Sequence, residues 1–452
     1  MNNNAFPSNF IWGTATASFQ VESHYLADGA GESLWSDFVT KPGRINNDGR
    51  PNISPDQFSK YKEDVQLMKW MNTNAYRFSI AWPRIFPEGT GKVNPKAFDY
   101  YDKLIDELLQ NDITPWVTLF HWDLPLELEK RYGGWRSKDT AKAFAEYVQY
   151  VVSKISDRVT NFFTINEVQA FTQFAYGMGY FPPRLCLSKK ETAQTIHNGL
   201  LAHGLGLEAA RAAAVQPVSV GLAENLIPVT PYIDKAEEIA ACKKALREVN
   251  ADRLTAILEG RYLESWLNEM GDDAPEYTDA EMKLIGAPLD FLGINVYTPA
   301  YYRADENNEK GYSEIRWPEK YPTLDMDWIH LGPEVLYWLP RLVNEVWNVE
   351  DIYISEFGGA CRDAIDDHSG HVYDLDRVMQ FRYGLREASR AIQEGIPLKG
   401  IFAWSLLDNF EWCVGFTKRF GLIYVDYFND NKRIPKASAE YYRSVISENR
   451  IL

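Results

Sequence analysis

Cysteine is scarce in this chain, with only four among 452 residues. They are scattered, and they form neither a Cys-x-x-Cys pair nor a spacing typical of zinc ligands: Cys186, Cys242, Cys361 and Cys413. A scaffold held together by disulfides needs more cysteines at closer spacing. The sequence therefore predicts free thiols in a reducing compartment, and it excludes a disulfide-rich or zinc-ribbon protein.

Long apolar runs are also missing. No stretch approaches the roughly 18 apolar residues that a membrane-spanning helix needs. The first seven residues contain neither a basic segment nor the apolar core of a secretion signal. We therefore expect a cytoplasmic protein that has no membrane as a partner.

Positive charge is in deficit, because 47 Lys and Arg residues face 63 Asp and Glu residues and leave a net charge of -16. The basic residues are dispersed, so no surface is predicted to neutralise a phosphate backbone, and nucleic acid is excluded as a partner. The seven histidines form no His-Glu-x-x-His motif, and His197 and His203 are six positions apart, off a common helical face. We expect neither a metal nor a cofactor.

Short apolar runs, by contrast, are frequent. Eight of them are rich in β-branched and aromatic residues and are typical of strands buried on both faces: 10–19, 75–81, 114–120, 160–165, 218–223, 291–296, 352–355 and 400–404. Segments with helical periodicity lie between them, among them residues 58–68, 98–108, 144–155 and 375–392, the last with Asp374 as its N-cap. Alternation of strand and helix predicts an α/β fold, a single (β/α)8 TIM barrel.

The length of the chain fits such a barrel with long insertions. No linker, low-complexity tract or repeat divides it, so residues 1–452 are expected to form one domain. Three long connections hold the extra length, at residues 27–54, 228–288 and 301–332. Because the segments that follow barrel strands form the active-site face, we expect these insertions to build pocket walls.

Polar or tryptophan side chains stand at the end of every predicted strand. They are Gln20 and Glu22, Arg77, His121 and Trp122, Asn166 and Glu167, Asn225, Asn295 and Tyr297, Glu356, and Trp404. Any one of them could simply satisfy loop backbone groups. Their presence after all eight strands indicates that they converge on one site at the same end of the barrel.

Glu167 and Glu356 are the candidates for chemistry. Taken alone, Glu167 could cap the next helix and Glu356 could pair with an arginine. A carboxylate at the end of a buried strand loses hydration, however, and normally has partners or a task. Together the two fit glycoside hydrolysis, in which one carboxyl protonates the leaving oxygen and the other attacks the sugar or activates water.

Four segments carry a recognisable pattern. Residues 10–20 read Phe-Ile-Trp-Gly-Thr-Ala-Thr-Ala-Ser-Phe-Gln, residues 76–84 read Tyr-Arg-Phe-Ser-Ile-Ala-Trp-Pro-Arg, residues 121–125 read His-Trp-Asp-Leu-Pro, and residues 404–412 read Trp-Ser-Leu-Leu-Asp-Asn-Phe-Glu-Trp. In this order, over essentially the whole chain, the pattern resembles glycoside hydrolase family 1, the β-glucosidase family. The resemblance implies a (β/α)8 barrel and hydrolysis with retention, with carboxyl groups about 5 to 5.5 Å apart.

The resemblance also implies roles for the catalytic residues. Glu167 matches the acid/base and Glu356 the nucleophile. Arg77 and Tyr297 are available to donate hydrogen bonds to Glu356 and hold it ionised, whereas Glu167 must keep a proton for the leaving group. Asn166 is expected to bind the sugar 2-hydroxyl. Asn225 and Asn295 either contact the sugar or orient the protein side chains beside it.

The sugar pocket is implied in the same way. Gln20, His121 and Glu411 match positions that hold the 3-, 4- and 6-hydroxyls, Trp412 adds a donor and Trp404 a stacking face. Trp122 and Phe420 are further candidates for the lining, and Trp328 resembles a platform for the leaving group. His121 could instead be a core histidine and Trp404 barrel packing.

The chain departs from the family pattern beside both glutamates. Val168 follows Glu167 where Pro is usual, and Phe357 follows Glu356 where Asn is usual. Neither departure changes a catalytic group. Phe357 puts an apolar ring beside the nucleophile, so we expect it to reshape the outer pocket or the groups behind the nucleophile.

These residues predict a retaining exo-β-glycosidase that releases terminal non-reducing β-D-glucosyl residues from small β-glucosides and short β-linked oligosaccharides, with β-galactosides and β-fucosides as further substrates. One alternative is a 6-phospho-β-glycosidase, which Lys418 could serve but which Glu411 would oppose by repelling phosphate; Phe420 also stands where such enzymes carry Tyr. The other is an inactive sugar-binding barrel, which would not need both carboxylates. Oligomeric state is left open, a homo-oligomer included.

Overall fold

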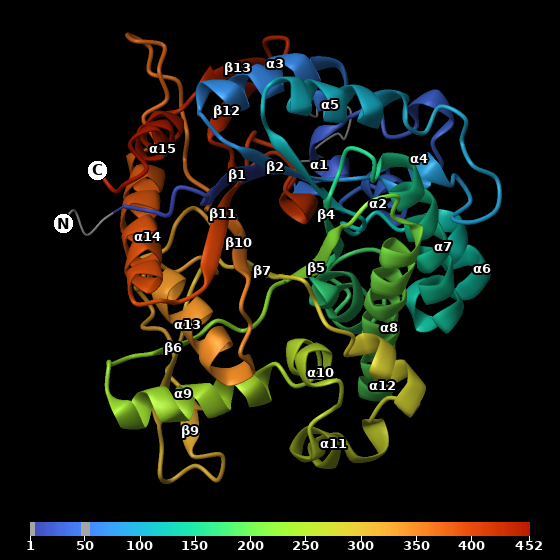
Figure 1. Ribbon diagram of the computed structural model, residues 1–452, viewed down its shortest axis with the longest axis vertical. Coiled ribbons are helices and arrows are strands. Elements are labelled where there is room, and N and C mark those ends of the chain that lie inside the picture. Colours follow the sequence, from blue (N-terminus) through green and yellow to red (C-terminus); the bar gives the residue numbers. More distant parts are fainter. Residues whose placement is uncertain (1–4, 47–54) are drawn as a thin grey trace.

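The computed structural model describes residues 5–46 and 55–452, and a closed barrel of parallel strands forms its centre (Figure 1). Around the barrel the strand order is β1-β11-β10-β7-β5-β4-β3-β2, so the last strand closes against the first. The strands are β1 (Ile11–Ala15), β2 (Ala75–Ser79), β3 (Thr114–Thr118), β4 (Asn161–Asn166), β5 (Ser219–Glu224), β7 (Leu292–Asn295), β10 (Ile352–Phe357) and β11 (Leu398–Trp404). The predicted (β/α)8 barrel is confirmed.

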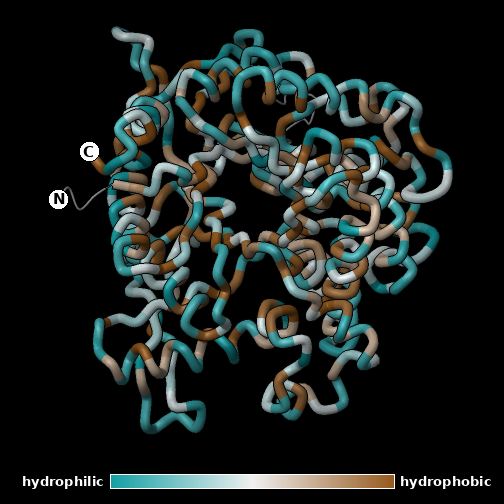
Figure 2. The backbone as a smooth tube through the Cα atoms, viewed as in Figure 1, coloured by the Kyte–Doolittle hydropathy of each residue, from teal (hydrophilic) through white to brown (hydrophobic). Residues whose placement is uncertain are grey.

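Helices surround the strands, and each buries an apolar stripe against them. In α5, for example, Tyr101, Leu104, Ile105 and Leu108 are buried at the three- and four-residue steps of a helical face. The principal helices are α3 (Gln57–Trp70), α5 (Asp99–Gln110), α7 (Lys138–Ile155), α8 (Lys189–Ala213), α12 (Asp279–Ile285), α13 (Val335–Trp347), α14 (Leu375–Gln393) and α15 (Ala437–Glu448). Hydrophilic residues dominate the outer loops and helix faces in Figure 2.

Further elements lie in the connections between these strands and helices. They are α1 (Ser18–Val21), η1 (Ala27–Gly29), α2 (Leu34–Val39), α4 (Trp82–Ile85), α6 (Leu126–Tyr132), η3 (Gly134–Arg136), η4 (Ala170–Gly177), β6 (Val229–Pro231), α9 (Ala236–Val249), α10 (Leu254–Glu259), α11 (Glu264–Met270), η5 (Gly271–Asp273), β8 (Ala300–Ala304), β9 (Tyr312–Glu314), η6 (Trp412–Val414), β12 (Ile423–Asp426) and β13 (Lys432–Pro435).

Aromatic side chains fill the barrel below the strand ends. The Trp116 ring lies 4.9 to 5.7 Å, between centroids, from the rings of Phe163, Phe291, Tyr353 and Phe402. Four of these residues come from four different strands of the barrel, and Phe291 immediately precedes β7. The floor they form supports the site from beneath. No helix of the described residues has both the length and the apolar character to cross a membrane.

The structure corrects several details of the predicted elements. Residues 18–21 form the short helix α1 and do not extend β1. Asp374 stands at the N-cap position of α14, but its side chain does not cap the helix. Its carboxylate instead accepts hydrogen bonds from Arg377 and from the backbone and side chain of Ser438.

The long connections contribute unequally to the active-site face. Residues 228–288 fold into β6, α9, α10, α11, η5 and α12, and none of them lines the cavity described below, so the expected wall is wrong for this segment. Residues 301–332 supply Trp328 to that cavity. In the first connection, of which residues 47–54 lie outside the described residues, Trp35 supports Trp412 with ring centroids 4.6 Å apart.

Candidate active site

A cavity of about 460 Å³ lies at the C-terminal ends of the barrel strands. Fifteen residues from many parts of the chain line it: His121, Trp122, Asn166, Glu167, Ala170, Phe174, Tyr180, Asn225, Tyr297, Trp328, Glu356, Trp404, Glu411, Trp412 and Phe420. Both candidate glutamates are among them, one at the end of β4 and the other in β10. Most of the strand-end residues therefore converge as predicted, whereas Glu22 is absent from the lining and is held by Arg84 at 3.1 Å and the Tyr101 hydroxyl at 2.9 Å.

Glu356 is buried and receives a donor on each carboxylate oxygen. Arg77 Nη1 donates to Oε1 at 2.7 Å, and the Tyr297 hydroxyl donates to Oε2 at 2.5 Å. Arg77 is itself fixed by hydrogen bonds to Thr118 Oγ1 and the Ser355 carbonyl, both at 3.0 Å. A fully buried guanidinium is thereby held against the Glu356 carboxylate.

The burial of the Glu167 carboxyl is compensated by fewer hydrogen-bond donors than that of Glu356. Its carboxylate accepts a hydrogen bond from Asn295 Nδ2 at 2.7 Å, and its hydrogen-bond partner carries no charge. Burial raises the pKa of Glu167 well above its usual value, and the negative charges of Glu356 and Glu224 raise it further. Both effects favour the protonated form of this carboxyl.

The pKa of Glu356 is raised as well, which corrects the expectation that Arg77 and Tyr297 simply hold it ionised. Burial outweighs the guanidinium and the hydroxyl, although both lower the pKa of this carboxyl. The difference between the two carboxyls persists, because only Glu356 has a cation in direct contact. When the pair shares one proton, Glu167 is the better holder.

Asn166 connects the catalytic groups to His121. Its Oδ1 accepts from Arg77 Nη2 at 2.6 Å and from Asn295 Nδ2 at 2.9 Å. Because a guanidinium can only donate, the amide orientation is determined, and Asn166 Nδ2 donates to His121 Nε2 at 3.2 Å. Burial and the charge of Arg77 lower the pKa of His121 well below its usual value, so the ring is neutral with its proton on Nδ1.

His121 Nδ1 has no protein partner although it is buried. The Nδ1 proton is therefore a free donor beside the cavity that the His121 ring lines. A buried N–H without a hydrogen-bond partner would be costly in the protein core. The geometry therefore favours a ligand-binding role for His121 over that of a core histidine.

Glu411 and Gln20 form a second pair of polar side chains at the site. Gln20 Nε2 donates to the Phe410 carbonyl at 2.8 Å and approaches Glu411 Oε2 at 3.4 Å. Glu411 is only partly buried because it faces the cavity, yet protein surrounds its carboxyl closely enough that burial, helped by the charge of Glu356, raises its pKa to about 8. Gln20 lies behind Glu411 and is absent from the cavity lining.

Tryptophans form much of the cavity wall. The Trp122 and Trp412 rings lie 4.5 Å apart, and Trp122 Nε1 donates to the Asn166 carbonyl at 2.8 Å. Trp404 is nearly parallel to the His121 ring at 5.7 Å. Trp328 meets Tyr297 edge to face at 5.6 Å and is 47% exposed, which places it at the mouth. These faces suit the apolar C–H surface of a sugar ring.

Three predicted residues act from behind the lining or lie elsewhere. Arg77 and Asn295 do not line the cavity but bond the residues that do. Lys418 is held by Asp325 at 3.1 Å and is not part of the lining.

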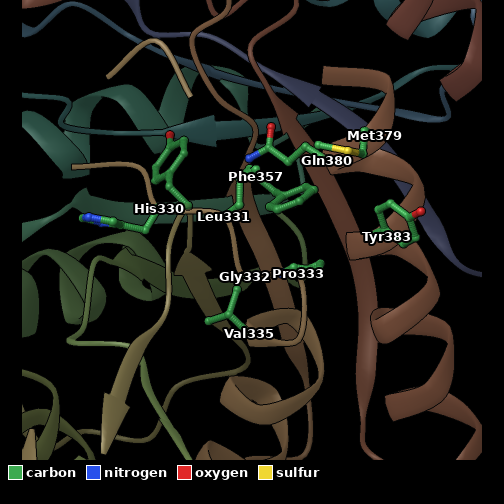
Figure 3. Close-up of a pocket in the computed structure, with 10 residues that line it drawn as sticks. His330, Leu331, Gly332, Pro333, Val335, Phe357, Met379, Gln380 and Tyr383 are labelled. Atoms are coloured by element: carbon green, nitrogen blue, oxygen red, sulfur yellow. The ribbon is translucent and has the colours of Figure 1, made fainter. Parts of the chain in front are cut away.

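Phe357 points away from the catalytic cavity, which corrects the expected effect on the outer pocket. Its ring is 2% exposed and packs against Phe381 of α14, with centroids 5.3 Å apart. It also lines a separate apolar cavity together with Met379, Gln380 and Pro333 (Figure 3). Alternation along β10 explains the difference, since Glu356 points into the barrel and its neighbour points out.

Sequence reasoning did not identify four residues near the catalytic centre. Ala170 and Phe174 of η4 and Tyr180 beyond it line the cavity, and Glu224 lies close enough to Glu167 to raise its pKa. Ala170 and Phe174 follow β4 on a helical segment and Tyr180 lies beyond it, so none of the three stands at a strand end. Glu224 is the last residue of β5, one position before the Asn225 that was considered.

The comparison with protein-family models identifies the family. A model described as Glycosyl hydrolase family 1 matches residues 2–451. The chain belongs to this family. As a family 1 glycosyl hydrolase it is an enzyme that hydrolyses glycosidic bonds.

Relatives of this family 1 enzyme match it over nearly its whole length. A 1,4-β-D-glucan glucohydrolase of Thermotoga neapolitana is 38% identical over 445 residues, 98% of each chain. β-Glucosidase A of Acetivibrio thermocellus is 38% identical over 452 residues, 99% of this chain and 100% of the relative. The solved family 1 β-glucosidase from Thermotoga maritima superimposes with a TM-score of 0.90 at 37% identity and covers 100% of both chains.

Proposed function

We propose that the protein is a retaining exo-β-glucosidase with Glu356 as nucleophile and Glu167 as acid/base. One observation carries the proposal: two buried carboxyls line one cavity, and only one of them contacts a cation. That asymmetry separates an ionised attacking group from a protonated one. Relatives named β-glucosidases that match the whole chain support the choice of sugar.

In the first step, a Glu356 oxygen attacks the anomeric carbon while Glu167 gives its proton to the leaving oxygen. A covalent glycosyl-enzyme results. Formation of the ester removes the charge of Glu356, which lowers the pKa of Glu167 and prepares it to act as a base. In the second step Glu167 takes a proton from water while the water oxygen attacks the anomeric carbon. The bond from that carbon to Glu356 breaks, so the sugar leaves with retained configuration and the carboxylate is restored.

We infer that polar groups around the cavity bind the sugar. The free Nδ1–H of His121 and the carboxyl of Glu411 are available to sugar hydroxyls, and Asn166 has a second amide hydrogen for the 2-hydroxyl. Trp404 and Trp412 supply stacking faces, and Trp328 supports the leaving group. Because none of these groups demands one configuration at the 4-position, we propose β-galactosides and β-fucosides as further substrates.

A phosphorylated sugar is disfavoured on grounds that differ from the expected charge repulsion. With its pKa raised to about 8, Glu411 is mostly uncharged at neutral pH in the empty cavity. However, the lining contains no Lys or Arg, and Lys418 is engaged by Asp325. A phosphate dianion would find no counter-charge there.

Substitution of the two carboxyls tests the proposal. Glu356→Ala should nearly abolish turnover of cellobiose and aryl β-glucosides while leaving binding largely intact. Glu167→Gln should cost about 10² to 10⁴ in kcat on poor leaving groups and much less on dinitrophenyl β-glucoside, which needs little protonation. Near-normal turnover of cellobiose by both variants would contradict the mechanism.

A substrate panel tests the sugar. The wild type should prefer cellobiose over its 6'-phosphate and should accept aryl β-glucoside, β-galactoside and β-fucoside. A preference for the phosphorylated sugar would overturn the substrate assignment, and no turnover of any member would favour the inactive sugar-binding barrel. We also propose that residues 1–452 act as one catalytic domain in the cytoplasm, in keeping with four cysteines that are all free.

A further inference from the structure

Glu224, the last residue of β5, is fully buried beside the segment that carries Glu167. Its Oε2 accepts a hydrogen bond from the backbone N–H of Val168 at 3.0 Å. The preceding N–H, that of Glu167, donates to the Ala223 carbonyl at 2.8 Å. The end of β5 therefore holds two consecutive peptide N–H groups around the proposed acid/base.

The held segment has an unfavourable backbone conformation. Glu167 has a φ of 52°, in the left-handed region that favours glycine. A residue with a Cβ stays there only when its surroundings fix it. The Val168 N–H also stands at the start of the helical segment that continues into η4, where it has no partner within the helix. Glu224 supplies that partner.

The charge of Glu224 is incompletely compensated. Its Oε1 has no hydrogen-bond partner, and the nearest cation, Arg253 Nε, is 3.7 Å away and itself unpartnered. Arg253 Nη1 is engaged by Asp252 at 2.7 Å. Burial raises the pKa of Glu224 to about 7, against the lowering effect of Arg253, so a substantial fraction is ionised at neutral pH.

Three charged groups face Glu167: Glu356 from β10, Glu224 from β5 and Arg77 from β2. The two glutamates favour its protonated form, and Arg77 favours its ionised form. Tyr297 and Asn295 face it as neutral groups near pH 7. Glu224 is the only one of the charged groups whose charge is not needed in the proposed bond-forming step.

We propose that Glu224 is a positioning residue for the acid/base: its carboxylate fixes the strained peptide after Glu167, and its negative charge favours the protonated form of Glu167. This inference rests on the proposed role of Glu167. A simple helix-capping role is the alternative, and it predicts an effect on stability alone.

Two substitutions separate the two actions. Glu224→Gln keeps an oxygen for the Val168 N–H and removes the charge, whereas Glu224→Ala removes both. Glu238 offers a matched control, because it is also a buried glutamate that accepts a backbone N–H, that of Ala304 at 2.6 Å, and it lies on α9 outside the catalytic cavity. Glu238→Gln and Glu238→Ala should change thermal stability only.

The readouts are the pH profile of kcat/KM and the dependence of rate on the leaving group. Glu224→Gln should move the basic limb to lower pH by about 0.5 to 1 unit, because a negative neighbour of Glu167 is lost. Glu224→Ala should show a further loss of roughly tenfold on phenyl β-glucoside, with dinitrophenyl β-glucoside affected by less than about threefold.

Glu167→Gln, measured in parallel, separates this inference from the proposed function. If it shows a leaving-group-dependent loss but both Glu224 variants keep the wild-type profile and leaving-group dependence, the inference is overturned and the acid/base role stands. If Glu167→Gln shows no such loss, the acid/base role fails and the inference fails with it. Should Glu224→Ala not fold, an unmoved basic limb in Glu224→Gln is sufficient to overturn the inference.

Discussion

Glu411 illustrates how one residue prepares the site for an uncharged ligand. In the empty cavity its pKa is raised to about 8, so at pH 7 the carboxyl is mostly protonated and costs little to bury. Sugar hydroxyls donate best to an ionised carboxylate. We therefore expect sugar binding to lower this pKa and to release a fraction of a proton near neutral pH.

Glu411→Ala should lower kcat/KM on 4-nitrophenyl β-glucoside by roughly 10- to 100-fold, the range for losing a hydrogen bond to a charged group. The loss on the β-fucoside, which has no 6-hydroxyl, should be smaller, so the fucoside-to-glucoside ratio should rise. Steady-state kinetics on both substrates measures it, with melting temperature as the check on folding. Equal losses on the two sugars would show that Glu411 does not contact the 6-hydroxyl.

At the residue scale, the sequence predicted which residues line the cavity better than it predicted the direction in which each side chain points. Glu167, Glu356, His121 and Glu411 all line the cavity as expected. The outward direction of Phe357 depends on the alternation within β10, and a short run that is apolar on both faces does not reveal it. Gln20 belongs to the motif but acts from behind, because α1 turns it toward Glu411.

At the scale of elements, Phe357 joins β10 to α14. A Cβ added at Gly384 would lie 2.6 Å from Phe357 Cζ and 3.1 Å from Leu336 Cδ1, so the glycine makes room for the ring. The apolar residue beside the nucleophile thus belongs to the packing between strand and helix. Its influence on catalysis has to pass through the position of β10.

Gly384→Ala tests this packing. In a free helix position the change would stabilise by about 1 kcal/mol, but the clash should reverse the sign and destabilise by roughly 1 to 3 kcal/mol. Urea unfolding gives the free energy. In the double-mutant cycle with Phe357→Leu, the second change should recover part of the loss, because the smaller side chain vacates the space. Additive effects of the two changes would mean that they do not share this contact.

The strands were predictable because apolar runs with β-branched residues mark them, and all eight lie within a few residues of their expected ends. The error at residues 18–21 has a physical cause: the apolar run continues past Ala15, and only tertiary contacts turn it into α1. The position of residues 228–288 was predicted wrongly because their helices, of which α9 has 14 residues, do not line the cavity. Tertiary packing determines the structure of both segments, and the periodicity of the sequence carries no information about it.

At the scale of the whole molecule, buried carboxyls tie stability to pH. Burial raises the pKa of Asp123 to about 8, and its Oδ1 has no hydrogen-bond partner. In the unfolded chain the group titrates near about 4. Between these values the folded state holds a proton that the unfolded state has lost, so the stabilisation is complete below about pH 4 and disappears as pH rises toward 8.

The melting temperature should accordingly fall from pH 5 to pH 9, and Asp123→Asn should flatten the slope because an amide does not titrate. Differential scanning fluorimetry across this range measures both. Asp37→Asn, at a carboxylate whose side chain is 33% exposed, serves as the control substitution. An identical slope in Asp123→Asn would show that this carboxyl is ionised in the folded protein.

The pairing of β1 with β11 has a consequence for synthesis. A ribosome releases Glu356, the proposed nucleophile, well before the strand that closes the barrel and before the loop that carries Glu411, Trp412 and Phe420. A nascent or truncated chain that ends before this segment contains both proposed catalytic carboxyls but not the complete cavity lining. We therefore expect enzyme activity only after translation has passed residue 420 and β1 has paired with β11. Shorter products should give no activity.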